Sequence, residues 1–352
     1  MTSVQTIQTT ETETKSGKQA YLEPTIPDIW PNGTKGNHLL KWLAFKGLAC
    51  FTATYCCTIY YVVPLSVLTL PLILWLRPGT GATILAVCAG SVLWPSGDWP
   101  AFRRFWQHLF YVFNIRSNFE EVSPRIDRKK RYIFAMHPHA IVPIHALIWC
   151  AFLDRQDRDL YGVGGMANII YYVPLVRNIF MWLNNVSASY NVLKSALLAD
   201  KNVYLLPDGI AGIYYSRPGQ HAVVLKKRRG LFRLAMETGA EILPIYCFGA
   251  NDLLNQATFG DSFIGRLSRK FRMSVTIFWG QLGLTIPFFA NMSYVFGEAV
   301  PAPKIDHASK SGEKFPEEVV EKFYEDYVRS LKEAFDKYKA AAGYPDGELI
   351  VV

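Results

Sequence analysis

A long apolar stretch near the N-terminal end is the strongest hydrophobic pattern in the chain. Between residues 47 and 97 the only charged side chain is Arg77, which separates an uncharged run over 47–76 from one over 78–97. A helix needs about 20 mostly apolar residues to cross a bilayer. The basic residues that flank the stretch are Lys35, Lys41, Lys46, Arg103 and Arg104.

Basic flanks favour the cytosolic side of a membrane, so both ends of the stretch are expected there. The pattern predicts a membrane-embedded hairpin anchor over residues 41–97 with its tip near Arg77, which either crosses the bilayer or enters and leaves on one side. A buried hydrophobic hairpin of a soluble protein is the alternative.

The rest of the chain divides into a polar tail and an α/β pattern. Residues 1–40 are rich in Thr, Glu, Gln and Lys and lack an apolar core, which predicts a disordered tail and not a cleavable signal. From residue 98 to residue 352, short apolar runs typical of strands alternate with segments of helical spacing. The alternation predicts one α/β domain with a mainly parallel sheet covered by helices. The strand-like runs span residues 132–136, 203–206, 242–247, 275–279 and 294–296.

Two helices have clear start and stop signals. Residues 230–238 have apolar positions at helical spacing, and Gly239 follows as a stop. The last helix starts at Pro316, carries acidic residues in its first turn as the helix dipole prefers, and is expected to end by Gly343. We expect this last helix to pack over the sheet, with a partner-binding or membrane-surface role as the alternative.

Composition narrows the class of partner. The formal net charge is +8, and 50% of the residues are hydrophobic. Basic clusters lie at residues 128–131, 226–229 and 266–272. No nucleic-acid motif accompanies them, and a membrane-anchored chain has anionic headgroups nearby, so no nucleic-acid partner is expected. The six cysteines lack the paired spacing of a metal site and are expected to be reduced.

Two histidines mark the junction of a predicted strand and a predicted helix. The segment His137-Pro138-His139-Ala140 follows the apolar run 132–136 and precedes another over 141–153. Strand ends present side chains on a rigid scaffold, and imidazole accepts a proton near neutral pH. The pair therefore predicts a proton-transfer site. Turn histidines bonded to the backbone, or two ligands of a zinc site, are the alternatives.

Three blocks of sequence carry a family resemblance. They are Tyr132-Ile133-Phe134-Ala135-Met136-His137-Pro138-His139, Arg229-Gly230-Leu231 and Pro244-Ile245-Tyr246-Cys247-Phe248-Gly249-Ala250-Asn251. In these blocks, and from about residue 40 to the end, the chain resembles the diacylglycerol acyltransferase type 2 family, which includes monoacylglycerol and wax-alcohol acyltransferases. The resemblance implies a glycerolipid-acyltransferase-like fold and a His-Pro-His-Gly motif in the active site.

The chain departs from the family pattern at three places. Ala140 replaces the usual glycine, so either the backbone there needs no positive φ or the site is altered. Gly212 stands where a Gly-Gly-x-x-Glu pattern has its glutamate, and Asp208 is the nearest carboxylate. We expect Gly212→Glu to be tolerated. Tyr111-Val112-Phe113 replaces a common Tyr-Phe-Pro.

The resemblance implies transfer of a fatty acyl group from acyl-CoA to diacylglycerol at the endoplasmic reticulum membrane, with the catalytic domain in the cytosol and the lipid-droplet surface as a second location. Acyl-CoA is then a substrate, and no cofactor or metal is expected; a homo-oligomer is allowed. His139 is the expected base, His137 orients it or binds the thioester oxygen, and Asp208 is a supporting carboxylate. Residues expected to bind acyl-CoA phosphates beside a helix start are Lys226, Lys227, Arg228, Arg229 and Gly230.

Alternative acceptors are monoacylglycerol and fatty alcohols. A metal-dependent lipid hydrolase that uses both histidines as ligands, or an inactive lipid-binding homologue, are the alternatives of other classes.

Overall fold

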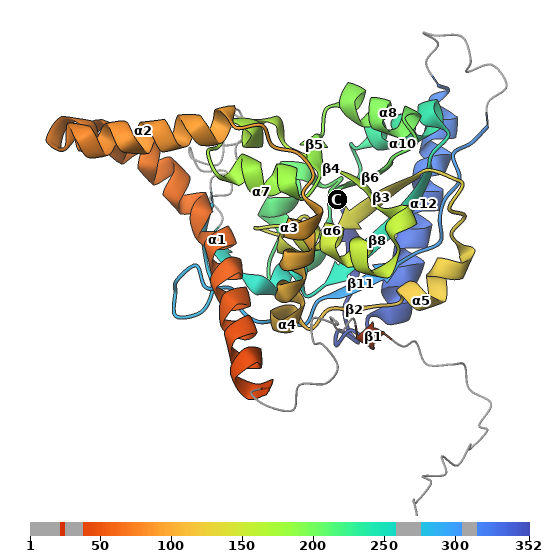
Figure 1. Cartoon of the computed structure of the whole chain (residues 1–352). Helices are drawn as coiled ribbons and strands as arrows, with labels where there is room; N and C mark the ends of the chain where they lie inside the picture. Colours follow the sequence, from red (N-terminus) through yellow and green to blue (C-terminus); the bar gives the residue numbers. More distant parts are fainter. Residues whose placement is uncertain (1–21, 25–37, 258–275, 305–314) are drawn as a thin grey trace, which may run out of the picture.

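A mainly parallel sheet forms the centre of the protein (Figure 1). The computed structural model describes residues 22–24, 38–257, 276–304 and 315–352. The main sheet has the strand order β1-β2-β11-β8-β3-β6-β4-β5. Strands β8, β3, β6, β4 and β5 run parallel to one another, while β11 is antiparallel to β8. The predicted α/β fold with a mainly parallel sheet is confirmed.

The strands of the described residues are short apart from the central ones. They are β1 Glu23–Pro24, β2 Arg116–Ser117, β3 Tyr132–His137, β4 Gly162–Met166, β5 Asn185–Ser187, β6 Asn202–Leu205, β7 His221–Val223, β8 Glu241–Phe248, β9 Asn255–Ala257, β10 Ile277–Trp279, β11 Ser293–Phe296 and β12 Leu349–Val351.

Helices connect these strands and cover both faces of the sheet. The α-helices are α1 His38–Leu76, α2 Pro78–Leu93, α3 Pro100–Trp106, α4 Phe110–Phe113, α5 Phe119–Val122, α6 Ile144–Gln156, α7 Val176–Trp182, α8 Tyr190–Leu198, α9 Gly209–Tyr215, α10 Arg229–Thr238 and α12 Glu317–Tyr338. Short 3₁₀ turns are η1 Gln107–Leu109, η2 Ser123–Arg125, η3 Arg158–Leu160, η4 Asn168–Tyr172 and η5 Ala250–Leu253.

The central strand β3 divides the core because successive side chains of a strand point to opposite faces. Tyr132, Phe134 and Met136 belong to a cluster that includes α3, α4 and α6. Ile133 and Ala135 belong to a second cluster formed with α8, α10 and α12. The alternation places His137 on the face that α12 covers.

Strand prediction succeeded best in the buried centre of the sheet. The runs at 132–136, 203–206, 242–247 and 294–296 correspond to β3, β6, β8 and β11. The run at 275–279 corresponds to β10, which pairs with β9 in a separate two-stranded sheet, and its first residue lies outside the described residues. Strand β4 was not predicted, because three of its five residues are glycine and no apolar run marks it.

Two helices meet at Arg77 and project from one side of the α/β domain (Figure 1). The sequence predicted a membrane-embedded hairpin here. Among the helices of the described ranges, none combines the length and the hydropathy that crossing a membrane requires.

The predicted disordered tail is only partly described. Residues 1–21 and 25–37 lie outside the described residues, but residues 22–24 differ from the prediction. Leu22 is buried, and β1 pairs antiparallel with β2 at the edge of the main sheet. The reason is the open edge of β2, which offers unpaired backbone groups to another strand.

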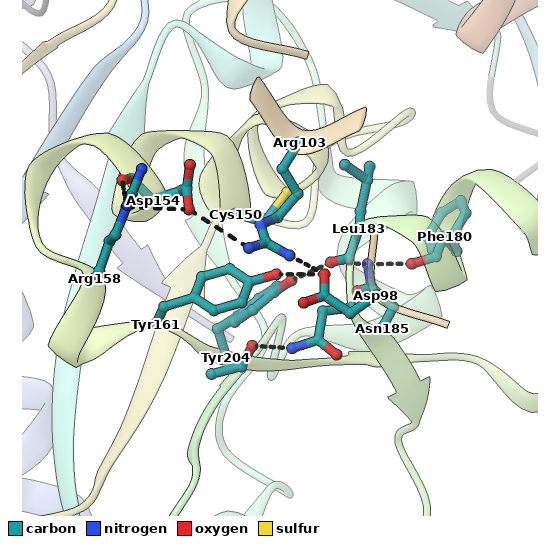
Figure 2. A network of polar contacts seen from close by, with 12 residues as sticks. Asp98, Arg103, Cys150, Asp154, Arg158, Tyr161, Phe180, Leu183, Asn185 and Tyr204 are labelled. Carbon is teal, nitrogen blue, oxygen red and sulfur yellow. Dashed lines mark hydrogen bonds and ion pairs between the residues drawn. The ribbon is translucent and has the colours of Figure 1, made fainter. Parts of the chain in front are cut away.

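A buried charged cluster fixes α3 to the domain (Figure 2). Arg103 lies between Asp98 and Asp154, with which it forms ion pairs, and its guanidinium stacks 4.2 Å from the ring centre of Tyr161. Arg103 and Asp154 are each 6% exposed. Removing one partner of such a buried pair leaves an uncompensated charge, so the cluster holds the segment that follows α2 in one position.

Candidate active site

His137 ends β3 and is held by partners from two other elements. Its Nδ1 lies 2.7 Å from Oδ2 of Asp208, and its Nε2 lies 2.6 Å from the hydroxyl of Tyr327 on α12. All three side chains are 0% exposed. A carboxylate only accepts hydrogen bonds, so Nδ1–H donates to Asp208 and the Tyr327 hydroxyl donates to Nε2. Both nitrogens of His137 are therefore engaged within the protein.

Asp208 follows β6, the parallel neighbour of β3, so the two strands deliver their side chains to the same edge of the sheet. Its second oxygen, Oδ1, accepts a hydrogen bond of 2.6 Å from the backbone N–H of Val224. The carboxylate thus receives two donors in a dry setting, which fixes its position. The structure brings together three of the predicted site residues, His137, His139 and Asp208.

The two ring nitrogens of His139 differ in their hydrogen bonding. Its Nδ1 lies 2.9 Å from the carbonyl oxygen of Ala140, and since a carbonyl only accepts, Nδ1 carries the hydrogen. In the neutral ring the lone pair is then on Nε2. Within the described part of the chain, Nε2 has no hydrogen-bond partner, and the side chain is only partly buried. The free lone pair of a partly accessible ring is what a general base needs.

The surroundings of His139 favour its neutral form. Burial lowers the pKa of His139 below its usual value, and the Arg228 cation lowers it further, while the Ala140 carbonyl and the Asp208 charge act in the opposite direction. A base with a lowered pKa keeps its lone pair at mildly acidic pH.

Ala140 occupies a conformation that favours glycine. Its φ is +59°, its side chain is buried, and its carbonyl is the group that holds His139. The sequence left open whether this backbone needs a positive φ, and it does. An alanine in the left-handed region costs about 1–2 kcal/mol relative to the right-handed one, so the motif keeps its backbone shape in spite of the substitution.

Gly212 on α9 leaves room for both Asp208 and His139. A Cβ built on Gly212 would lie 2.6 Å from Cβ of Asp208 and 2.8 Å from Cβ of His139. Neither contact is with the far end of a flexible side chain. The expectation that Gly212→Glu is tolerated is therefore contradicted, because the carboxylate of Asp208 already occupies this side of the helix.

The basic run at the start of α10 divides into three kinds of side chain. Lys226 and Lys227 are exposed. Arg228 donates a hydrogen bond of 2.7 Å from Nη2 to the carbonyl oxygen of Asp208. Arg229 pairs with Glu321 through two hydrogen bonds and stacks 3.6 Å from the ring centre of Tyr324. Gly230 is exposed, with open space around its Cα.

Two site residues were missed by the sequence analysis. Tyr327 is spaced like a core residue of the last helix, and nothing in the apolar stripe distinguishes it. His145 lies in the first turn of α6, is 0% exposed, and neither of its ring nitrogens has a hydrogen-bond partner among the described residues. Burial lowers the pKa of His145 to about 3, and the nearby His139 and His137 contribute.

The zinc alternative requires further ligands beside the two histidines. Among the residues that the structure describes, no group of three or more His, Cys, Asp or Glu side chains is placed to hold a metal ion.

Comparison with known proteins identifies the family. A family model described as diacylglycerol acyltransferase matches residues 96–352. Diacylglycerol O-acyltransferase 2-like protein 6 of Mus musculus is 30% identical over 262 residues, which cover 68% of this chain and 74% of that protein. Diacylglycerol O-acyltransferase 2 of Dictyostelium discoideum is 28% identical, covering 77% of this chain and 82% of that protein.

A relative named for another acceptor is equally similar. Acyl-CoA wax alcohol acyltransferase 2 of Mus musculus is 28% identical over 71% of this chain and 77% of that protein. The crystal structure of the LPA acyltransferase PlsC from Thermotoga maritima aligns with a TM-score of 0.40 at 14% identity, over 81% of this chain and 97% of that chain. The assignment rests on the sequence comparisons, which confirm the resemblance: the chain belongs to the diacylglycerol acyltransferase family and is an acyltransferase.

Proposed function

We propose that this acyltransferase moves a fatty acyl group from acyl-CoA to the free hydroxyl of diacylglycerol and so makes triacylglycerol, with His139 as general base. The observation that carries the proposal is the state of His139, whose Nδ1 is bonded to the Ala140 carbonyl while Nε2 is left open. The family supports the reaction class.

The chemistry requires a base because a lipid hydroxyl is a poor nucleophile. Nε2 of His139 takes the hydroxyl proton as the oxygen attacks the thioester carbon, and it returns the proton to the CoA sulfur as the C–S bond breaks. A positioned imidazole contributes about 10²–10⁴ to the rate of such a step. His137 has no nitrogen free for substrate, so it holds the loop that carries His139 in place.

Acyl-CoA binds along the segment before α10. The phosphates of CoA are exposed anions at neutral pH, and Lys226 and Lys227 are exposed cations beside the start of that helix. Arg229 is engaged by Glu321 and Tyr324 and contributes no free donor edge to this surface.

The acceptor is tested by supplying purified protein with labelled oleoyl-CoA and a panel of diacylglycerol, monoacylglycerol and hexadecanol. Labelled triacylglycerol as the main product supports the proposal. A wax ester as the main product would assign the protein to fatty alcohols instead, as the name of one relative suggests. Release of free fatty acid without any ester would refute acyl transfer.

The hairpin of α1 and α2 holds the enzyme against the cytosolic face of the endoplasmic reticulum membrane, where it meets diacylglycerol. The proposal rests on the apolar side chains that these helices expose, including Leu68 at 74%, Trp75 at 78% and Leu93 at 80%. Exposed apolar patches of this kind mark interaction surfaces, and a hairpin that enters the membrane from one side needs no crossing helix.

Liposome flotation tests the membrane contact. Replacing Leu68, Trp75 and Leu93 by serine is expected to reduce co-flotation of the protein with liposomes several-fold. Leu282→Ser is the matched control, because Leu282 is 91% exposed but lies outside the hairpin. Unchanged flotation of the triple variant would refute the contact.

A further inference from the structure

Two adjacent arginines at the start of α10 have opposite surroundings. Arg229 is saturated by two hydrogen bonds to Glu321 and by the ring of Tyr324. Arg228 is half-buried, and among the described residues its guanidinium makes one hydrogen bond, from Nη2 to the carbonyl oxygen of Asp208. No carboxylate forms an ion pair with Arg228 within the described ranges of the chain. Its guanidinium is therefore held through Nη2, and its remaining N–H groups are available to an anion.

The guanidinium lies beside His139 along one face of α9. A Cβ built on Gly209 would lie 3.2 Å from Nη2 of Arg228, and a Cβ built on Gly212 would lie 2.8 Å from Cβ of His139. Residues three apart share a helix face and are separated by about 4.5 Å along the axis. Gly209 and Gly212 carry no side chains, so Arg228 approaches α9 at Gly209 while His139 and Asp208 approach it at Gly212.

Gly209 is required for this approach by its backbone as well. Its φ is +55°, and the Asp208 carbonyl that precedes it accepts the Arg228 hydrogen bond. A side chain there would be strained and would also press on the guanidinium. The backbone thus fixes where Arg228 points before substrate arrives.

We propose that Arg228 is a catalytic residue that donates hydrogen bonds to the carbonyl oxygen of the acyl thioester and stabilises the negative charge that develops there. The inference rests on the proposed acyl transfer. As the acceptor oxygen bonds to the carbonyl carbon and His139 takes the hydroxyl proton, the C=O π electrons move onto the oxygen that faces Arg228. Collapse re-forms the C=O bond, breaks the C–S bond, and the CoA sulfur takes the proton from His139.

The burial of Arg228 distinguishes its proposed role from phosphate binding. Lys226 and Lys227 are exposed and suit the mobile, hydrated phosphates of CoA. Arg228 is half-buried, and its planar fork is held by a backbone carbonyl. Preorganised donors in a partly desolvated site act on charge that appears only in the transition state.

Steady-state kinetics with oleoyl-CoA and diacylglycerol test the role, using Arg228→Met and Arg228→Lys. We expect Arg228→Met to lower kcat by about 10²–10³-fold, the loss typical of one oxyanion donor, with the KM for oleoyl-CoA changed by less than about threefold. Arg228→Lys keeps the positive charge but loses the planar fork of donors, so its kcat is expected to lie between those of the wild type and Arg228→Met. The control is Arg233→Met on the same helix, where Arg233 pairs with Glu317 and kcat should stay at the wild-type level.

The outcomes separate this inference from the proposed function. A higher KM for oleoyl-CoA with unchanged kcat in Arg228→Met would make Arg228 a phosphate contact and overturn the role. If Arg228→Met does not accumulate as folded protein, the same kcat and KM criteria apply to Arg228→Lys. If the wild-type protein makes ester and kcat is unchanged in both variants, the role of Arg228 is overturned while the proposed acyl transfer stands. A wild-type protein that makes no ester from oleoyl-CoA overturns both.

Discussion

Replacing Gly212 by alanine tests the packing on which the position of His139 depends. The added Cβ would lie 2.6 Å from Cβ of Asp208 and 2.8 Å from Cβ of His139, against ordinary contacts of 3.4–4 Å. The two gaps fall short of 3.4 Å by about 0.8 and 0.6 Å, so one or both neighbours must move by that amount.

The effect on stability is expected to be small and the effect on turnover large. Overpacking in a filled site costs about 1–3 kcal/mol, while alanine in place of glycine favours a helix by up to about 1 kcal/mol. The net loss in unfolding free energy is then up to about 2 kcal/mol. Displacing a base by nearly 1 Å reduces turnover by about 10²-fold, because proton transfer depends steeply on distance.

The measurement is kcat together with the thermal midpoint, with Gly47→Ala as the matched control. Gly47 also lies in a helix, and a Cβ there meets nothing within 4 Å, so this variant should keep its activity and gain stability. Full activity of Gly212→Ala, or an equal loss in Gly47→Ala, would refute the argument that Gly212 sets the spacing of the site.

Three further experiments test the roles assigned to the site. His139→Ala should abolish acyl transfer while His137→Ala leaves a measurable remnant, since base and orienting residue differ in their contribution to rate; normal turnover of His139→Ala at equal abundance would contradict this. Tyr327→Phe removes the donor to Nε2 of His137 and should cost about 1–3 kcal/mol of stability and lower kcat, whereas Tyr324→Phe, whose ring stacks on Arg229, should keep kcat. His145 should make the protein sensitive to acid: its pKa is 6.5 in the unfolded chain and about 3 in the fold, so below pH 6.5 only the unfolded state takes up the proton and about 2 kcal/mol of stability is lost by pH 5. Urea midpoints at pH 7.5 and 5 should therefore differ less in His145→Gln than in the wild type, and an equal difference would contradict the assignment.

The sequence predicted three candidate site residues that the structure brings together, but not their supporting contacts. A buried parallel strand must be apolar on both faces, so the run 132–136 stands out, and the polar residues after it must lie at the carboxyl edge of the sheet. Asp208 came from the family resemblance, as the carboxylate nearest to the missing glutamate, and the structure places it after the adjacent strand β6. Pairing of strands that lie far apart in sequence is enough to bring these residues together.

Tyr327 could not be assigned from the sequence because its role depends on which face of β3 the last helix covers. The spacing of α12 predicts a buried stripe, and every member of such a stripe looks like core. Only the alternation along β3, combined with the position of α12, shows that Tyr327 meets His137. The positive φ of Ala140 was equally hidden, since alanine is not a residue that favours this conformation.

Asp208 and Gly212 form a reciprocal pair when compared with the family pattern. In Gly-Gly-x-x-Glu the first glycine falls on position 208 and the glutamate on 212, whereas this chain has the carboxylate at 208 and the glycine at 212. The two positions are one helical turn apart on the same face, and a Cβ at 212 would lie 2.6 Å from that of Asp208. The site therefore holds one side chain at these positions and not two.

Exclusion of this kind predicts that the two substitutions depend on each other. Gly212→Glu alone should lose acyl transfer because the new side chain collides with Asp208 and His139, and Asp208→Gly alone should lose it because His137 and the Val224 N–H lose their acceptor. The double variant Asp208→Gly/Gly212→Glu removes the collision and returns a carboxylate to the same helix face. Residues in contact typically couple by about 0.5–3 kcal/mol, so kcat/KM of the double variant should exceed the value expected from the two single losses by up to about 100-fold. Purely multiplicative losses across the four proteins would show that the two positions act independently, and the exchange of carboxylate for glycine would then have no steric origin.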